Sequence, residues 1–361
     1  MEKIKVLIVD DSAFARKMLT QMLASDPEIA VVGTAMDGIF ALNKIEKLKP
    51  DIVTLDISMP RMDGIEALKR IMGDFGLQVI IVSSHTKKNA DLSISALEMG
   101  AFDLVAKPEK ALSEDIVTIS NELIRKVKEA YRSPLAKLKI KEVTAVPVQK
   151  EEELLSEKKN TAGRVLAIGT STGGPNALTY LLPHIPKNFP AGILIVQHMP
   201  AGFIDMFASR LNSICEIEVK EAKDGDLVLP GRALVAPSRK HLTVRKRPLG
   251  MIAVLSNSPP ESGHKPSADV LYRSVAEEYG EKATGLILTG MGHDGAEGIG
   301  EIMRRGGLTV AQDENSCVVY GMPKAAIEKN NVKHVLSLEE IGGYLVKHFM
   351  GKEARHGTVR C

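Results

Sequence analysis

Three short polar segments in the second half of the chain carry the residue types of a nucleophilic hydrolase. They read Gly-Thr-Ser-Thr-Gly at 169–173, Gln-His-Met-Pro at 197–200 and Met-Gly-His-Asp-Gly at 291–295. Each segment follows an apolar run that predicts a buried strand, and ligands of parallel α/β sheets bind beyond the carboxyl ends of such strands. We therefore expect Ser171, His198 and Asp294 to meet as nucleophile, base and orienting acid.

The segment around Ser171 is typical of a nucleophile elbow, which is a tight turn between a strand and a helix. The flanking glycines permit the turn, and a helix starting near Pro175 leaves the N–H of Thr172 available to an oxyanion. The competing interpretation is a phosphate-binding loop, because the same geometry binds anions. That interpretation is weaker because the Gly-x-Gly-x-x-Gly and Gly-Lys-Ser/Thr patterns are absent.

The base and the acid are chosen by their places after strands. His198 directly follows a strong strand, whereas His264 and His293 remain alternatives as residues of binding loops. A bond from Asp294 to the ring N–H would fix the tautomer of the base, although an aspartate before a glycine is also compatible with a helix cap. The order Ser, His, Asp differs from that of α/β-hydrolases, so the Gly-x-Ser-x-Gly match does not imply their fold.

The first half of the chain predicts an acidic pocket at the edge of another sheet. Four of five predicted strands end at polar residues, which are Asp10 with Asp11, Asp56, Ser83 and Lys107. Carboxylates gathered there repel one another unless a cation is present, and oxygen ligands suit Mg²⁺. Asp56 would then attack a phosphoryl donor. For Asp10 or Asp11 taken alone, a helix cap is the simpler interpretation.

The elements that hold these residues form two α/β blocks. Residues 1–125 alternate strand and helix patterns five times, which predicts a five-stranded parallel, flavodoxin-like sheet. Residues 126–163 are rich in Glu and Lys and predict a charged linker. Residues 164–350 predict a doubly wound α/β domain with a mixed sheet, and residues 351–361 a flexible tail. The mixed sheet includes strands expected to be antiparallel at 233–236, 242–245 and 251–255.

Composition limits the class of protein. A chain of 361 residues that is 44% hydrophobic and 25% charged has room for two globular domains. The net charge of +2 and the short basic stretch at 239–247, which we interpret as an exposed hairpin, argue against nucleic-acid binding. We expect a cytoplasmic protein without membrane insertion, because no apolar run reaches about 18 residues and the start predicts a strand. The three cysteines lack C-x-x-C spacing, and we expect Cys317 to be a small buried residue.

Residues 1–125 resemble the receiver domain of two-component response regulators. The resemblance rests on Asp10-Asp11, Asp56, Met59-Pro60-x-Met62-Asp63-Gly64, Ser83 and Lys107-Pro108. It implies Asp56 as the phospho-acceptor, Ser83 as a switch hydroxyl and Lys107 as a phosphate contact. It also implies a magnesium site made of Asp10, Asp11, Asp56 and the carbonyl of Ser58. The aromatic switch residue usual three positions before the lysine is Leu104 here.

Residues 5–349 as a whole resemble the chemotaxis protein-glutamate methylesterase family, in which a receiver domain precedes a methylesterase domain. The motifs are Ser171-Thr172-Gly173-Gly174, His198-Met199-Pro200, Ala236-Pro237-x-x-x-His241, His264-Lys265-Pro266-Ser267-x-Asp269, Thr289-Gly290-Met291-Gly292-x-Asp294-Gly295 and Asp313-Glu314-x-Ser316-Cys317. The resemblance implies γ-glutamyl methyl esters on the cytoplasmic helices of chemoreceptors as substrate, and a chemotaxis histidine kinase as phosphodonor. It implies the N–H groups of Thr172 and Met291 as oxyanion donors, and an ester step that needs no cofactor.

Other functions fit parts of the pattern. A transcriptional regulator would need a recognition helix and a basic surface, which the second block does not offer. The same site is suited to deamidate receptor glutamine, and a noncatalytic phospho-dependent adaptor would keep the fold without the chemistry. We expect the first domain to inhibit the second until Asp56 is phosphorylated.

Overall fold

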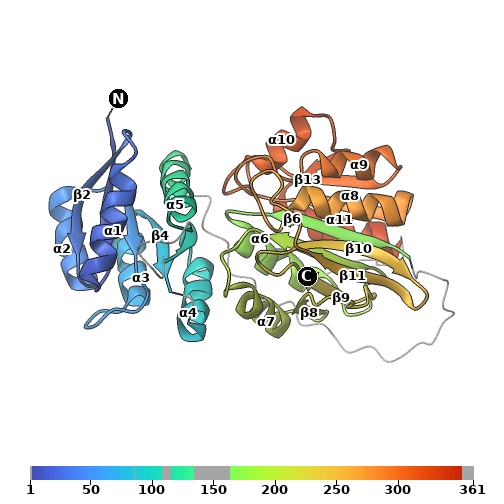
Figure 1. Cartoon of the computed structure of the whole chain (residues 1–361), viewed down its shortest axis with the longest axis horizontal. Helices are drawn as coiled ribbons and strands as arrows, with labels where there is room; N and C mark the ends of the chain where they lie inside the picture. The colour runs from blue at the N-terminus through green and yellow to red at the C-terminus, as the bar shows by residue number, and fades with distance from the viewer. Residues whose placement is uncertain (1, 85, 108–114, 134–162, 352–361) are drawn as a thin grey trace, which may run out of the picture. The chain divides into compact units, whose positions relative to one another are not determined.

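The computed structural model describes residues 2–84, 86–107, 115–133 and 163–351, which form two α/β units (Figure 1). Residues 134–162 of the predicted linker and residues 352–361 of the predicted tail lie outside the described residues. Among the described helices, none combines the length and apolar character needed to span a bilayer.

The first unit is built on a five-stranded parallel sheet. Its strands are β1 (Ile4–Val9), β2 (Ile29–Ala35), β3 (Ile52–Leu55), β4 (Gln78–Ser83) and β5 (Asp103–Ala106), in the order β2-β1-β3-β4-β5. Its helices are α1 (Ala13–Ala24), α2 (Gly38–Leu48), α3 (Gly64–Phe75), α4 (Lys87–Glu98) and α5 (Asp115–Arg132). This strand order confirms the flavodoxin-like prediction. Helix α5 crosses residue 125, where we placed the end of the domain.

The second unit is built on a seven-stranded sheet. Its strands are β6 (Val165–Thr170), β7 (Gly192–Gln197), β8 (Glu218–Glu221), β9 (Arg232–Val235), β12 (Ala283–Ile287), β13 (Leu308–Gln312) and β14 (His334–Leu336). Its α-helices are α6 (Gly174–Leu181), α7 (Ile204–Ile214), α8 (Ala268–Tyr279), α9 (Gly298–Arg304), α10 (Met322–Glu328) and α11 (Leu338–Met350). The strand order is β14-β13-β12-β6-β7-β9-β8. The chain adds strands on one side of β6 and then, from β12 onward, on the other side, so the switch point lies between β12 and β6, and ligands of open α/β sheets bind at such a point.

The doubly wound prediction is confirmed, but the prediction of a mixed sheet is wrong. Every strand pair in the seven-stranded sheet is parallel, including β9 with both of its neighbours. Strand β9 ends in three buried apolar residues, as parallel strands covered on both faces do. The antiparallel strands β10 (His241–Arg247) and β11 (Gly250–Ser256) pair only with each other in a separate sheet. The predicted exposed hairpin at 239–247 is confirmed only in part, because residues 241–247 form its first strand, only the last three residues of that strand are exposed, and the hairpin extends to Ser256.

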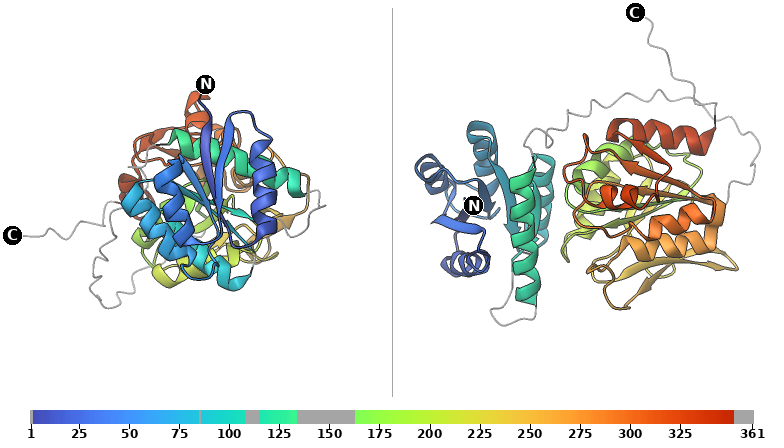
Figure 2. Two further views of the ribbon diagram at one scale, coloured as in Figure 1. Left: turned by 90° about the vertical axis from the view of Figure 1, so that its left-hand side faces the viewer. Right: turned by 90° about the horizontal axis from the view of Figure 1, so that it is seen from above.

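Close packing of helix α8 brings its N-terminus to the switch point. Helices cover both faces of the sheet in the second unit (Figure 2), and β6, β7 and β12 are buried at every position. The buried Tyr272 of α8 donates a hydrogen bond to the carbonyl of Leu286 (2.5 Å). A Cβ atom at Gly169 would lie 2.6 Å from Tyr272 Oη and 2.7 Å from Ala268 Cβ. Glycine at 169 therefore allows α8 to approach the end of β6.

Candidate active site

Ser171 lies in a tight turn between β6 and α6. Gly173 has φ 79°, a left-handed conformation that glycine adopts without strain, and its position against Val318 leaves no room for a side chain. The side-chain amide of Gln197 donates to the carbonyls of Ser171 and His198 (both 2.9 Å), and the N–H of His198 donates to the carbonyl of Thr170 (3.1 Å). The ends of β6 and β7 are thereby joined directly at the serine.

Thr289 joins the segment after β12 to the same turn. Its carbonyl accepts hydrogen bonds from the Ser171 N–H (3.1 Å) and the Thr170 hydroxyl (2.8 Å). Its own hydroxyl donates to the carbonyl of Thr172 (3.0 Å). The next residue, Gly290, is so close that a Cβ atom there would lie 2.9 Å from Ser171 Cβ. The backbone that leads into Met291 therefore passes beside the serine.

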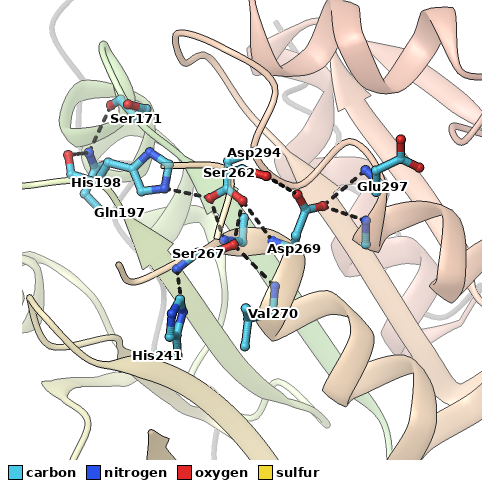
Figure 3. A network of polar contacts seen from close by, with 12 residues as sticks. Ser171, Gln197, His198, His241, Ser262, Ser267, Asp269, Val270, Asp294 and Glu297 are labelled. Carbon is cyan, nitrogen blue, oxygen red and sulfur yellow. Dashed lines mark hydrogen bonds and ion pairs between the residues drawn. The ribbon is translucent and has the colours of Figure 1, made fainter. Parts of the chain in front are cut away.

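His198 and Asp294 form a hydrogen-bonded pair. The distance from His198 Nε2 to Asp294 Oδ2 is 2.8 Å, and both side chains are largely buried. Figure 3 shows the polar network that leads from Ser171 and Gln197 through His198 to Asp294. The sequence prediction that these three segments converge is in accord with this geometry.

The second nitrogen of the histidine ring has no such bond. His198 Nδ1 is buried and has no hydrogen-bond partner within the described part of the chain, so no bond to the Ser171 hydroxyl is made there. Because Nε2 contacts an acceptor, it carries the proton in the neutral ring, and Nδ1 is the nitrogen with a free lone pair.

The carboxylate of Asp294 is held by the first turn of α8 rather than by its own neighbours. It accepts hydrogen bonds from the Ser267 hydroxyl (2.6 Å), the Ala268 N–H (2.7 Å) and the Asp269 N–H (3.2 Å). Burial acts to raise the pKa of Asp294, but the bonds from His198, Ser267 and Ala268 outweigh it and bring this pKa well below its ordinary value. Asp294 is therefore a permanently ionised partner for the histidine.

The donors to Asp294 are themselves anchored. The N–H of Ser267 donates to His241 Nδ1 (3.2 Å), and His241 Nε2 lies 3.0 Å from the carbonyl of Pro259, to which it donates. Asp269 accepts from the N–H groups of Glu297 (3.1 Å) and Gly298 (2.6 Å). We assigned no roles to these residues from the sequence, although a serine just before an apolar-periodic segment is a recognisable N-cap signal.

The two alternative histidines differ in their positions. His293 is exposed, whereas the ring of His264 is stacked on that of His198, with centroids 3.9 Å apart and an interplanar angle of 4°. Cys317 is fully buried, which confirms the prediction of a small buried residue.

The first unit gathers the predicted acidic residues at the carboxyl edge of its sheet. Ligand oxygens of Asp10, Asp11 and Asp56 all lie within 4.8 Å of one another. Lys107 Nζ lies 2.7 Å from Asp10 Oδ2 and 2.8 Å from Asp56 Oδ2. Burial raises the pKa of Asp56, against the opposing charge of Lys107, and the neighbouring Asp10 raises it further.

Apart from Asp10 Oδ2, which is ion-paired with Lys107, two buried oxygens in this acidic pocket have no hydrogen-bond partner among the described residues, Asp56 Oδ1 and Ser83 Oγ. Buried polar atoms in native proteins are normally satisfied, so these two indicate a ligand. A set of hard carboxylate oxygens fits Mg²⁺, and the free oxygen of Asp56 fits phosphoryl transfer. Ser58, whose carbonyl we predicted as a ligand, is exposed, and its hydroxyl lies 2.6 Å from Asn89 Oδ1. Leu104, at the usual aromatic switch position, is buried.

Both halves of the chain match known families. Residues 166–345 match the family model described as CheB methylesterase, and residues 6–117 match the response regulator receiver domain. A protein-glutamate methylesterase/protein-glutamine glutaminase of Koribacter versatilis is 51% identical over 346 residues, which cover 95% of each chain. This chain belongs to the CheB methylesterase family.

Other members of the CheB methylesterase family match over nearly the same length. The Pyrococcus horikoshii protein-glutamate methylesterase/protein-glutamine glutaminase is 44% identical over 99% of this chain and 98% of its own. The crystal structure of the Thermotoga maritima CheB methylesterase catalytic domain covers 52% of this chain and 98% of its own, at 41% identity and a TM-score of 0.51. The family therefore accounts for both halves of the chain, as the sequence resemblance implied.

Proposed function

We propose that this protein hydrolyses γ-glutamyl methyl esters on the cytoplasmic helices of chemoreceptors, giving glutamate and methanol, under the control of phosphorylation. The observation that carries the proposal is the His198–Asp294 pair, held beside Ser171 at the switch point of the second sheet. The names of the relatives supply the substrate class. The reaction takes place in the cytoplasm, where those receptor helices lie.

The proposed mechanism uses Ser171 as nucleophile. His198 Nδ1 takes the proton from the Ser171 hydroxyl as Oγ attacks the ester carbonyl, and Asp294 stabilises the imidazolium that forms. The tetrahedral oxygen is held by the N–H groups of Thr172 and Met291. The imidazolium then protonates the leaving methoxide, and methanol departs. Water then attacks the acyl-enzyme, with His198 again taking the proton, and this step releases the glutamate and restores the serine.

The lack of a hydrogen bond between the Ser171 hydroxyl and His198 Nδ1 in the described part of the chain is compatible with this role. Catalytic hydrogen bonds are often long or misaligned until substrate binds. The backbones of residues 171 and 198 are already joined through Gln197. A change of the Ser171 side-chain rotamer would therefore redirect its hydroxyl relative to His198 without moving the backbone.

The same residues deamidate glutamine. An amide carbonyl takes the place of the ester carbonyl, and the imidazolium protonates the departing nitrogen, so ammonia is released instead of methanol. We expect the amide reaction to be slower, because an amide carbonyl is less electrophilic than an ester carbonyl and an amide anion is a poorer leaving group than methoxide.

Control comes from Asp56. We infer that Asp10, Asp11, Asp56 and the Ser58 carbonyl would hold Mg²⁺, which would neutralise charge on the transferred phosphoryl group. The free carboxylate oxygen of Asp56 attacks the phosphoryl donor, which in the cell is a chemotaxis histidine kinase. Lys107 pairs with the phosphate that results, and the Ser83 hydroxyl, which has no hydrogen-bond partner among the described residues, donates to it.

Methanol release tests the proposal. Methylated receptor membranes are incubated with the full chain, with and without a small-molecule phosphodonor, and methanol is measured over time. We expect release that the phosphodonor accelerates, and a loss of about 10³- to 10⁶-fold in Ser171→Ala. Near-normal release by Ser171→Ala would exclude that serine as nucleophile. No release by the unmodified protein in either condition would favour the noncatalytic adaptor.

Ammonia release tests the second activity separately. Membranes that carry glutamine at the modification sites replace the methylated ones, and the Ser171→Ala protein is the control. Ammonia that the serine variant produces equally would contradict a shared site.

A further inference from the structure

The ring stacked on His198 has no part in the mechanism above. The rings of His264 and His198 lie in nearly parallel planes, with an interplanar angle of 4°, and their centroids are 3.9 Å apart. Offset aromatic stacks commonly have centroid distances of about 4.5–7 Å, so this contact is a close one. His264 therefore covers one face of the proposed base.

The backbone that carries His264 is fixed on both sides. The N–H of His264 donates to the Glu261 carbonyl (2.8 Å), and the N–H of Glu261 donates to the His264 carbonyl (3.0 Å). The two residues between them, Ser262 and Gly263, have φ 52° and 76°. Positive φ at both central residues is the geometry of a type I′ hairpin turn. His264 is the last residue of this four-residue turn.

Side chains attach this turn to α8. The Ser262 hydroxyl donates to Asp269 Oδ2 (3.1 Å), and Glu261 forms an ion pair with Arg273. Asp269 also belongs to the segment that holds Asp294, because its N–H donates to that carboxylate beside the N–H of Ala268. One helix therefore supports both the carboxylate that bonds the edge of the His198 ring and the imidazole that covers its face.

The His198 ring needs a second constraint. Its hydrogen bond through Nε2 fixes one point of the ring, and Nδ1 has no hydrogen-bond partner among the described residues. Held by its covalent bond to Cβ and by this hydrogen bond, the ring remains able to turn about the line that joins the two points, and that turn would carry Nδ1 away from the serine. A flat group packed parallel to the ring opposes this rotation, because tilting would separate the two faces or force them to clash.

We propose that His264 is a positioning residue that holds the plane of His198 by stacking, so that Nδ1 stays directed at Ser171. This inference rests on the proposed function. It requires a planar side chain at position 264 rather than a titratable one. Because misplacement of a reacting group by about 1 Å costs on the order of 100-fold in rate, loss of the stack is expected in kcat rather than in KM.

Three substitutions in the full chain separate the possibilities. His264→Phe keeps a planar face without an ionisable group, His264→Leu keeps apolar bulk without a plane, and His264→Ala removes both. Methanol release from methylated receptor membranes gives kcat and KM for each. We expect kcat to fall about 10- to 100-fold in the Leu and Ala variants with KM within about 3-fold, and to recover in the Phe variant to within about 5-fold of the unmodified protein.

Controls and contrary results are distinct. His184→Leu makes the same chemical change at an exposed histidine outside the site, and thermal unfolding of each variant checks the fold. Equal losses in the Phe, Leu and Ala variants would show that the imidazole itself is needed, and a rise in KM alone would make His264 a substrate contact. Either result, or no change in any variant, would overturn the inference. Failure of the unmodified protein to release methanol would instead overturn the proposed function.

Discussion

Two buried aspartates at the carboxyl edges of the two sheets have opposite surroundings. Asp294 accepts hydrogen bonds from Ser267, from the first N–H groups of α8 and from His198, and its pKa is lowered. Asp56 pairs with Lys107, keeps one oxygen without a hydrogen-bond partner among the described residues, and has a raised pKa. The same residue type is thus saturated with donors in one site and incompletely satisfied in the other.

This difference fits the two kinds of chemistry that we propose for these aspartates. A carboxylate with every lone pair engaged orients its partner and does not react, which suits the support of a catalytic base. A carboxylate with a free oxygen is available to bind a cation and attack phosphorus. The donors around each residue, more than its position after a strand, determine the proposed role.

Among substitutions that test this comparison of the two aspartates, the largest effect on methanol release is expected when Asp294 loses its charge. Asp294→Asn places an amide NH₂ among groups that already donate, so the histidine loses its orientation and tautomer. We expect methanol release to fall by up to about 10⁴-fold. Steady-state kinetics on methylated receptor membranes measure the loss, and a change smaller than about 10-fold would show that the pair is not catalytic.

Asp56→Asn tests the reactive aspartate. The variant retains the size of the side chain but loses the nucleophilic oxygen, so phosphoryl incorporation from a small-molecule donor should fall to background. Acceleration of methanol release by the donor should disappear with it. Mass spectrometry of the intact protein detects the phosphoryl group, and continued uptake by Asp56→Asn would assign the acceptor to another residue.

Ser267→Ala removes one donor from Asp294 without touching the proposed reacting groups. A hydrogen bond to a charged group contributes about 1.5–3 kcal/mol. Without it, Asp294 holds the His198 ring less firmly, and part of this loss should appear as a lower rate of methanol release. We expect methanol release to fall about 10-fold, with KM nearly unchanged. Ser274→Ala in the same helix is a matched control, and an equal loss in that variant would attribute the effect to α8 as a whole.

The smallest effects, on stability, should have opposite signs. At pH 7 we expect Asp294→Asn to destabilise the second domain by about 2–4 kcal/mol, because buried donors lose a charged acceptor. We expect Asp56→Asn to stabilise the first domain by about 1 kcal/mol, because an ionised group with a raised pKa is disfavoured by folding. Hydrogen exchange of peptides from β3 and α8 measures the two domains separately. A change in stability of the same sign in the two variants would contradict the proposed difference between Asp294 and Asp56.

The pH dependence sharpens this contrast. The contribution of Asp294, whose folded pKa is lowered, is complete above its unfolded pKa near 3.8 and is lost only as the pH falls below that value. The penalty of Asp56, whose folded pKa is raised, is complete above that raised pKa and declines as the pH falls from there toward the unfolded pKa near 3.8. As the pH is lowered toward 3.8, the difference in free energy of unfolding between Asp56→Asn and the unmodified chain should therefore decrease. Over the same pH range, the difference between Asp294→Asn and the unmodified chain should stay constant.

The sequence predicts strand ends better than it predicts what surrounds them. Ser171, His198, Asp294 and Asp56 follow apolar runs, and this periodicity was sufficient to expect them at sheet edges. The direction of β9 was not predictable from its run of residues, since a short apolar strand fits parallel or antiparallel pairing. The donors to Asp294 come from a helix that begins 26 residues earlier, so they depend on the docking of α8 at Gly169. Likewise, no local pattern places His264 on the face of His198.

Covalent labelling tests the central claim most directly. The full chain is treated with a fluorophosphonate, which reacts with activated serine hydroxyls, and the modified residue and its rate are determined by mass spectrometry. If His198 activates Ser171, the label appears at Ser171 in the unmodified protein, and at least about 10³-fold more slowly in His198→Ala. Equal labelling rates in the two proteins, or a label on another serine that abolishes methanol release, would contradict the account.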